Sequence, residues 1–428
     1  MTDRLKKTLE DHKREYLQPL LELAKLDTHC IGHGIDGGLE KAGQDYIAVL
    51  LGKMGAEVRI VPMKEEDIRT AIERYHDGNP GHNYTDRANV YGRFAGGDGR
   101  SIMFNGHMDT MPAAAELWHT DPWTPTEKDG KLYGLGICDM KSGIMASVMA
   151  VQLLRDAGFE LPGYVVITSV ADEEGGGNGS IAAAIQGERA DAVVVCEGTN
   201  YELIAAHMGF VFFRVETEGL AVHSGIKWQG VSAIEKAMKL IRALDELEHR
   251  WLLRYKHPLL PAPNLNVGTI HGGTAGSTTA GICTFEVCVH YLPGQMSYEQ
   301  VVSEFNETVD RVCRGDAWME EHHPKVSVYQ SGNAFEMDTE HPFTHAFRKA
   351  WETLHGKPVA VVGSPAGCDS RTWRNIAGCP TLQYGPGELS QCHSVDEHID
   401  LDMYYDAILT YAALILEWCG SIEGGERK

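Results

Sequence analysis

The order of apolar and polar positions predicts alternating strands and helices over the first half of the chain. Apolar residues recur at helical spacing between charged ones at 4–26, and similar patterns at 40–54, 144–157 and 180–185 also predict helices. Short apolar runs, several rich in β-branched residues, predict strands between them. This alternation indicates an α/β layer with a mixed, mostly parallel sheet flanked by helices. The predicted strands are 57–62, 89–94, 101–104, 164–170 and 192–195.

The pattern changes from about Phe210, where apolar and polar residues alternate as in a half-solvated strand. The order that follows is strand, helix, strand, strand, helix, strand, which is typical of a ferredoxin-like α+β sandwich. Helices at 342–354 and 401–418 then resume the first pattern. We therefore expect one catalytic domain formed by 1–208 and 332–428, with an α+β domain at 209–331 inserted into it.

Composition narrows the class of protein. The 428 residues are enough for two or three domains, and 38 basic against 60 acidic residues give a formal charge of −22. Without a basic run, we expect neither nucleic acid nor an anionic membrane as a partner. We see no signal peptide and no apolar run long enough to span a bilayer. Ten scattered cysteines without a CxxC motif indicate reduced thiols, and hence a cytoplasmic protein.

Polar residues follow three of the predicted strands. His107 comes at the exit of the strand at 101–104, Glu173 and Glu174 follow 164–170, and Glu197 follows 192–195. In sheets of this kind, binding sites lie beyond the carboxyl ends of the strands. The four side chains are therefore predicted to converge at one edge of the sheet.

The candidates for chemistry are two imidazoles and five carboxylates, which suit zinc, with manganese or cobalt as substitutes. One distribution gives each of two ions two terminal ligands and lets one carboxylate bridge them. The remaining two carboxylates then fit an orienting group and a general base for a bridging water, in an order that the residues alone leave open. The seven candidates are His107, Asp109, Asp139, Glu173, Glu174, Glu197 and His393.

Several motifs, taken together and in order, resemble the M20 family of metallopeptidases and deacylases. That family includes acetylornithine deacetylase, succinyl-diaminopimelate desuccinylase, aminoacylase and glutamate carboxypeptidase. The resemblance covers nearly the whole chain. The matching stretches are Gly106-His-Met-Asp-Thr-Met-Pro112, Trp118-x-x-Asp-Pro-Trp123, Asp129-Gly-Lys-Leu-Tyr-Gly-Leu-Gly136, Cys138-Asp-Met-Lys-Ser-Gly143, Asp172-Glu-Glu-Gly-Gly176, Cys196-Glu-Gly-Thr199, Tyr384-Gly-Pro-Gly387 and His393-Ser-Val-Asp-Glu397.

The resemblance implies a zinc-peptidase-like catalytic domain and a role for each candidate. His107 and Glu197 would bind one divalent ion, Glu174 and His393 would bind the other, and Asp139 would bridge them. Asp109 would orient His107, and Glu173 would act as the general base. A cis peptide bond between Asp139 and Met140 is also implied.

Four further positions concern the substrate. In dimeric members a histidine matching His223 reaches into the partner's site and polarises the substrate carbonyl, which implies a homodimer through the inserted domain; a structural histidine is the alternative. Arg371 lies where relatives bind a substrate carboxylate, although a salt bridge, for example to Asp369, is an equal alternative. Ser277 and His290 stand where many members have Asn and Arg, which predicts weaker binding of a substrate carboxylate.

We therefore expect a metal-dependent hydrolase that cleaves the amide C–N bond of an N-acyl amino acid or a small peptide. An alternative keeps the metal site but acts on a non-peptide C–N bond, such as that of an arylamine or carbamoyl substrate. A second alternative is a non-catalytic metal-binding protein of the same fold, which the seven filled positions disfavour. Ser-His-Asp catalysis is disfavoured because the chain has no Gly-x-Ser-x-Gly elbow.

Overall fold

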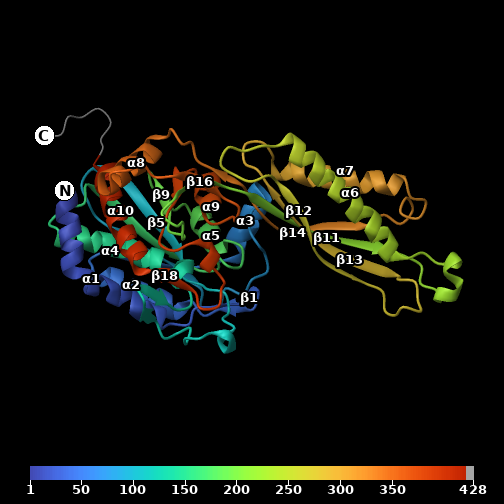
Figure 1. Cartoon of the computed structure of the whole chain (residues 1–428), viewed down its shortest axis with the longest axis horizontal. Coiled ribbons are helices and arrows are strands. Elements are labelled where there is room, and N and C mark those ends of the chain that lie inside the picture. The colour runs from blue at the N-terminus through green and yellow to red at the C-terminus, as the bar shows by residue number, and fades with distance from the viewer. Residues whose placement is uncertain (421–428) are drawn as a thin grey trace.

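A computed structural model describes residues 1–420 and divides into a large and a small lobe (Figure 1). The large lobe is built on a nine-stranded sheet in the order β15-β10-β17-β9-β5-β8-β4-β3, with β16 paired to β10. Around β5 the sheet is parallel, while β3 and β4 are antiparallel to their neighbours. The strands are β3 (Glu57–Pro62), β4 (Ala88–Phe94), β5 (Gly99–His107), β8 (Gly163–Val170), β9 (Val193–Val195), β10 (Leu203–His207), β15 (Phe335–Glu336), β16 (Val361–Ser364) and β17 (Thr381–Gln383).

Helices cover both faces of this sheet because its central strands are apolar on both sides. Val194 and Phe104 pack into the core on one face, while Val193 and Met103 pack into the core on the other. The first face is covered by α1 (Thr2–Ala24), α2 (Lys41–Lys53), α4 (Ser142–Asp156), α8 (Pro342–His355) and α10 (Leu401–Cys419). The second is covered by α3 (Glu65–Tyr75), α5 (Asn178–Ile185) and α9 (Ser370–Asn375).

The small lobe is an antiparallel four-stranded sheet, in the order β12-β13-β11-β14, with two helices on one face. Val211, Phe213 and Val215 of β11 are buried in the core of this lobe. Ser232 and Ser297 cap the two helices by accepting a backbone N–H. The elements are β11 (Gly209–Glu218), α6 (Ala233–Arg254), β12 (Asn264–Gly272), β13 (Ile282–Tyr291), α7 (Tyr298–Arg314) and β14 (Lys325–Gly332).

Smaller elements complete the described chain. A two-stranded sheet joins β1 (Cys30–Gly34) to β2 (Gly37–Gly38), and a three-stranded sheet has the order β18-β7-β6. The members of the latter are β6 (Thr126–Lys128), β7 (Lys131–Tyr133) and β18 (His398–Asp400). The short helical turns are η1 (Ala115–Leu117), η2 (Ile137–Lys141), η3 (Ser224–Gln229) and η4 (Leu389–Gln391).

The expected mixed α/β fold is confirmed, and each predicted strand or helix has a counterpart within a few residues. The pattern did not predict α3, β10 or α9. One expectation needs correction: the stretch Ile137–Asp156, which includes α4, is long and apolar enough to cross a membrane by length and composition. It is 89% buried inside the protein, where α4 packs against α1 and α10, so it serves as a core helix.

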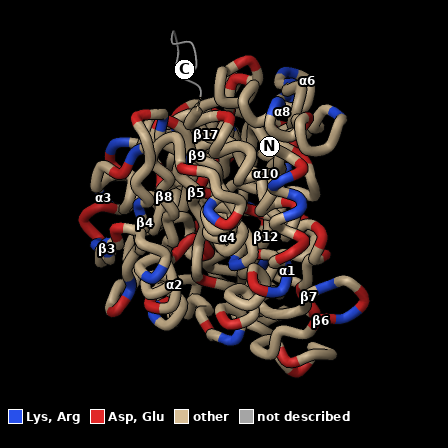
Figure 2. Tube along the Cα trace, turned by 90° about the vertical axis from the view of Figure 1, so that its left-hand side faces the viewer, with Lys and Arg blue, Asp and Glu red and all other residues tan. Residues whose placement is uncertain are grey.

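Charged residues lie mainly around the outside of the large lobe. Figure 2, which views this lobe end-on, shows Lys and Arg positions interspersed with Asp and Glu positions around the periphery, while the central strands are mostly uncharged. In this view the acidic and basic positions are therefore mixed rather than gathered at one end.

Candidate metal centre

Parallel strands bring four of the predicted residues to one edge of the large sheet. His107 is the last residue of β5 and pairs in register with Val170, the last residue of β8. Glu173 and Glu174 follow β8, and Glu197 follows β9, which runs parallel to β5 on its other side. The predicted convergence at the strand exits is therefore present in the fold.

Two loops supply the remaining ligand candidates. Asp139 lies in the η2 turn that leads into α4, and its peptide bond to Met140 is cis. His393 follows η4 and has a left-handed backbone with φ of 58°. Both reach the strand exits from elements distant in sequence, so one chain provides all of these candidates.

The five predicted ligands form two groups that share Asp139. In one group, Nε2 of His107 lies 2.8 Å from Oδ1 of Asp139 and 3.6 Å from Oε1 of Glu197. In the other, Nε2 of His393 lies 2.9 Å from Oε2 of Glu174 and 3.4 Å from Oδ2 of Asp139. In each group, one donor atom per residue lies within 4.8 Å of the others. Asp139 thus directs one oxygen to each group.

The electrostatics of these residues are those of crowded carboxylates. Burial, together with the charge of Asp139, raises the pKa of Glu174 to about 7 and that of Glu197 well above its ordinary range. Burial also acts to raise the pKa of Asp139, but hydrogen bonds to His107 and His393 lower it overall. The pKa of His107 is raised despite its burial because Asp139 and Glu197 face it.

This donor set fits divalent cations. Carboxylate oxygens and imidazole nitrogens are the ligands of zinc and related ions, and positive charge would relieve the repulsion among the acids. The buried Oε1 of Glu174 has no hydrogen-bond partner among the described residues, which is costly unless a ligand engages it. The residues present can therefore hold two ions with Asp139 between them.

Asp109 acts on the site through both its main chain and its side chain. Nδ1 of His107 donates to the main-chain oxygen of Asp109 at 2.9 Å, while the nearest carboxylate oxygen is 3.7 Å away. That carboxylate instead accepts the backbone N–H groups of Glu173 and Glu174, at 3.1 and 2.9 Å. Asp109 therefore contacts His107 through its carbonyl and fixes the acidic loop through its carboxylate.

Glu397 is a positioning residue to which sequence reasoning gave no role, although it ends a matched motif. It is buried, and its carboxylate accepts the backbone N–H groups of Gly136, Cys138 and Asp139 at 2.7–3.0 Å. Burial raises its pKa to about 8. The turn that carries Asp139 is thus held from the C-terminal part of the chain.

A buried polar network behind the acidic loop was also missed. Arg87 pairs with Glu40 and, at 3.0 Å, with Asp172, the residue before Glu173. Nδ1 of His82 lies 2.7 Å from the other oxygen of Asp172. All four side chains are buried, and each lies far from its partner in the sequence, so no local pattern could reveal the network.

A cavity of about 400 Å³ opens beside the ligand candidates. Asp139, Glu173, Glu174, Glu197 and His393 line one side, so the predicted general base faces the same space as the ligands. Burial raises the pKa of Glu173 well above its ordinary value, and nearby acids add to the effect. The other side is lined by residues that include Phe210, Gln330, Ser364, Cys368, Arg371 and Gln383.

Arg371 lies in the lining but is already engaged by the protein. Its Nε pairs with Asp77 at 3.1 Å, and its two terminal nitrogens donate to the carbonyls of Cys368 and Gly176, each at 2.8 Å. The salt-bridge alternative is therefore present, with Asp77 as partner. Asp369, the partner suggested from sequence, accepts a hydrogen bond from Ser180 instead.

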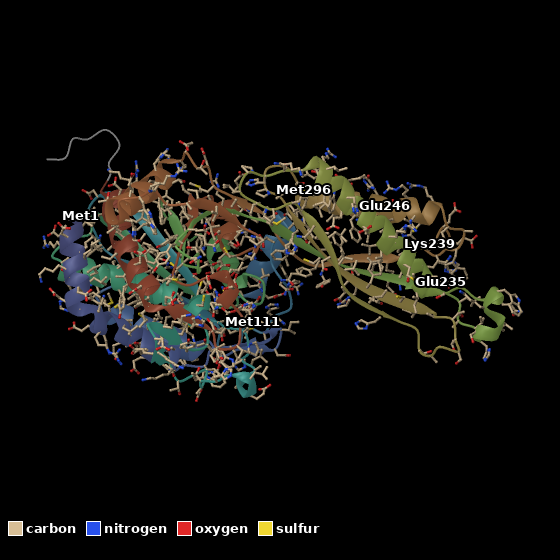
Figure 3. The ribbon with its side chains drawn as sticks, in the orientation of Figure 1. Met1, Met111, Glu235, Lys239, Glu246 and Met296 are labelled. Atoms are coloured by element: carbon tan, nitrogen blue, oxygen red, sulfur yellow. The ribbon has the colours of Figure 1, made fainter. Side chains whose placement is uncertain are left out.

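The three other predicted substrate residues are absent from the cavity lining. His223 and Ser277 are exposed on adjoining segments, where Ser224 donates to the main-chain oxygen of Ser277. These segments lie beside Glu235, which pairs with Lys227 and stands at the far end of the small lobe (Figure 3). His290 is half-buried on β13 beside Phe210 in register, and its Nδ1 lies 3.2 Å from Oδ1 of Asn264. Their roles stay predictions.

The fold and these ligand groups define an α/β protein with a carboxylate- and histidine-lined site suited to divalent cations. The chain belongs to peptidase family M20/M25/M40, whose family model matches residues 103–417. The relatives described next whose names state a reaction are hydrolases of amide C–N bonds.

Two curated relatives illustrate the range. N-formyl-4-amino-5-aminomethyl-2-methylpyrimidine deformylase of Bacillus subtilis is 29% identical over 97% of both chains. Acetylornithine deacetylase of Pectobacterium carotovorum is 30% identical, over 90% of this chain and 94% of its own.

Solved structures share the fold at lower identity. A dipeptidase from Saccharomyces cerevisiae superposes with a TM-score of 0.74 at 16% identity, over 99% of this chain and 100% of its own. A metallo-carboxypeptidase of the M20 family from Sulfolobus solfataricus reaches 0.75 at 16% identity, over 95% of this chain and 100% of its own.

Proposed function

We propose that this protein is a dinuclear metal-dependent hydrolase that cleaves an amide C–N bond of a small molecule, with Glu173 as general base. The observation that carries the proposal is the pair of ligand groups, His107–Asp139–Glu197 and Asp139–Glu174–His393, joined through one carboxylate. The alternative of a non-catalytic metal-binding protein is disfavoured because the base faces the same cavity as the ligands.

The ligand set suits zinc first, with manganese or cobalt as alternatives. When bound, such ions polarise a carbonyl oxygen and lower the pKa of a coordinated water toward neutrality. His107 and Glu197 would hold one ion and His393 and Glu174 the other, with Asp139 shared between them. Asp109 and Glu397 would keep these ligands in place through the backbone hydrogen bonds that they accept.

Glu173 then moves the proton. Burial raises the pKa of Glu173 well above its ordinary value, which makes its carboxylate a stronger base toward an attacking water. Glu173 would take that proton and deliver it to the nitrogen of the leaving amine as the C–N bond breaks. Asp109 supports this step because its carboxylate binds the backbone N–H of Glu173.

His223 would act on the carbonyl from a second subunit. His223 is exposed at the start of η3, and the yellow-green chain segment there lies at the far end of the small lobe, away from the strand exits of the large lobe (Figure 1). Leu220 and Trp228 in the same segment are 47% and 77% exposed, which supports burial against another copy. We therefore propose a homodimer formed through the inserted domain at 209–331.

The motifs and the relatives favour different classes of substrate. The motifs predict an N-acyl amino acid or a small peptide, and one relative is named for acetylornithine. Another is named for the formyl amide of an aminomethylpyrimidine, which supports the alternative of a non-peptide amine. We also propose a cytoplasmic location, because all ten cysteines are free thiols.

The test is a hydrolysis screen with protein loaded in turn with zinc, manganese and cobalt. The panel contains N-acetyl, N-succinyl and N-formyl amino acids, dipeptides, and N-acyl and N-carbamoyl amines, with release of the amine as the readout. We expect metal-dependent release from at least one class. Binding of two ions per chain without hydrolysis of any member would favour the non-catalytic alternative.

A further inference from the structure

The side of the cavity facing the ligand groups has little positive charge to offer a substrate. Among all the described residues that line the cavity, Arg371 is the one Lys or Arg side chain, and the four acids lie on the side of the ligand groups. The availability of this guanidinium therefore decides whether a substrate carboxylate can be bound there.

Arg371 is not available. It is 2% exposed and donates to the Asp77 carboxylate and to two main-chain carbonyls, as described above. Asp77 is fully buried and balances its charge. The ring of Phe210, which also lines the cavity, has its centroid 5.5 Å from the guanidinium carbon. A carboxylate entering the cavity would have to displace bonds that are already made, and burying an unpaired charge is costly.

A second subunit would not supply the missing cation at the segments that carry His223 and Ser277. Residues 219–232 and 272–281 contain a single Lys or Arg, Lys227, which is paired with Glu235. His290, where many family members have Arg, is half-buried, and burial lowers its pKa. Neither the described cavity lining nor these two segments therefore offers an unpaired Lys or Arg side chain.

The same lining offers neutral contacts. Gly332 and Gly367 lie against the ring of Phe210, and a side chain on Gly332 would collide with it. Cys368 donates to Oε1 of Gln383 at 3.2 Å, and Gln383 itself lines the cavity. Gln330 lies near Gly176 in the same lining. An aromatic face and two amides suit a flat ring with polar substituents.

We propose that the substrate is the N-acyl derivative of an amine that bears no carboxylate, with an aromatic ring of that amine lying against Phe210. This inference rests on the proposed amide hydrolysis and specifies its substrate. It departs from the N-acyl amino acids and peptides that the motifs favour.

A matched pair of substrates tests it. N-acetyl-2-phenylethylamine and N-acetylphenylalanine differ only in the carboxylate. We expect metal-loaded enzyme to hydrolyse the first with a kcat/KM at least about tenfold higher, since an unpaired polar group in a buried site costs at least that factor. The net charge of −22 is controlled for by repeating the comparison at about 1 M salt, where the screening length is about 3 Å. A preference for N-acetylphenylalanine at high salt would overturn the inference.

A binding measurement tests this inference independently of whether the protein hydrolyses amides. Both amides are titrated calorimetrically into the metal-loaded Glu173→Gln variant, which does not need to turn over. Tighter binding of the carboxylate-free amide supports the inference even if the wild-type protein hydrolyses no amide. That lack of hydrolysis would count against the proposed function alone. Tighter binding of N-acetylphenylalanine overturns the inference even if hydrolysis is fast.

Two variants test the position of the ring. Phe210→Leu should lower the preference for N-acetyl-2-phenylethylamine over N-acetylbutylamine about tenfold, because the aromatic face is lost. Phe212→Leu is the matched control, since Phe212 lies two residues along β11 with its ring 5.7 Å from that of Phe210 but outside the cavity lining. Equal losses in the two variants would contradict contact with Phe210.

Discussion

The exits of the large sheet and the far end of the small lobe differ in how complete they are within one chain. At the strand exits, five ligand candidates form two groups whose donor atoms lie within 4.8 Å of one another, and the predicted base lines the same cavity. At the far end, His223 and Ser277 are exposed, and among the described residues the ring of His223 hydrogen-bonds to the nearby Gly225 N–H alone. The difference indicates that the metal site we propose would be complete within one chain, whereas the proposed polarisation of the carbonyl by His223 would need a second chain.

Removing the metal ions expected at the strand exits should lower activity more than any other change. Dialysis against a chelator should abolish hydrolysis, and added zinc, cobalt or manganese should restore it, because the acids there need divalent ions to act together. Amine release is the measurement, and circular dichroism is the control for folding. Full activity in protein shown to be free of metal would contradict a metal-dependent site at the strand exits.

Loss of the general base should come next. Glu173→Gln should lower turnover at least about a hundredfold, and up to about ten-thousandfold, because the proton of the attacking water then has no acceptor. Steady-state kinetics measure the change, and metal analysis checks that the ions stay bound. Glu66→Gln, which makes the same substitution at an exposed position on α3, serves as the matched control. Near-normal turnover of metal-loaded Glu173→Gln would remove Glu173 from the mechanism.

His223→Ala should cost about a hundredfold in kcat if the ring stabilises the developing oxyanion. Mixing with Glu173→Gln sharpens the comparison, because a heterodimer would have one site with both groups intact. After subunit exchange, a one-to-one mixture should recover about a quarter of wild-type activity, since half of the dimers are mixed and each has one intact site. Activity no higher than the mean of the two separate variants would show that the sites are not shared.

The smallest effect is expected at the positions that depart from the family pattern. The double change His290→Arg with Ser277→Asn should raise kcat/KM for N-acetylphenylalanine a few-fold, because it would add about one charged hydrogen bond to the carboxylate at a partly exposed site. The kcat/KM for N-acetyl-2-phenylethylamine should stay unchanged. Parallel kinetics on the two amides measure it. An equal change for both amides would mean that these positions affect the fold of the small lobe and not recognition of a carboxylate.

Much of this site could be predicted because its ligands stand directly after apolar strands. His107, Glu173, Glu174 and Glu197 owe their places to strand exits, which the pattern of apolar residues marks. The pairing of Arg371 with Asp77 could not be predicted, because the two residues are 294 positions apart and meet only through tertiary packing. Glu397 was missed for the same reason: its bonds go to the backbone of a distant turn. The short helix α9 has too few residues to show a period.

The central claim is that one chain gathers two divalent ions around a shared carboxylate. Anomalous diffraction from crystals grown with zinc tests it most directly. The account predicts two anomalous peaks per chain, one on each side of Asp139, with His107 and Glu197 at the first and Glu174 and His393 at the second. Peaks at other residues, or a single peak that Asp139 does not contact, would contradict it.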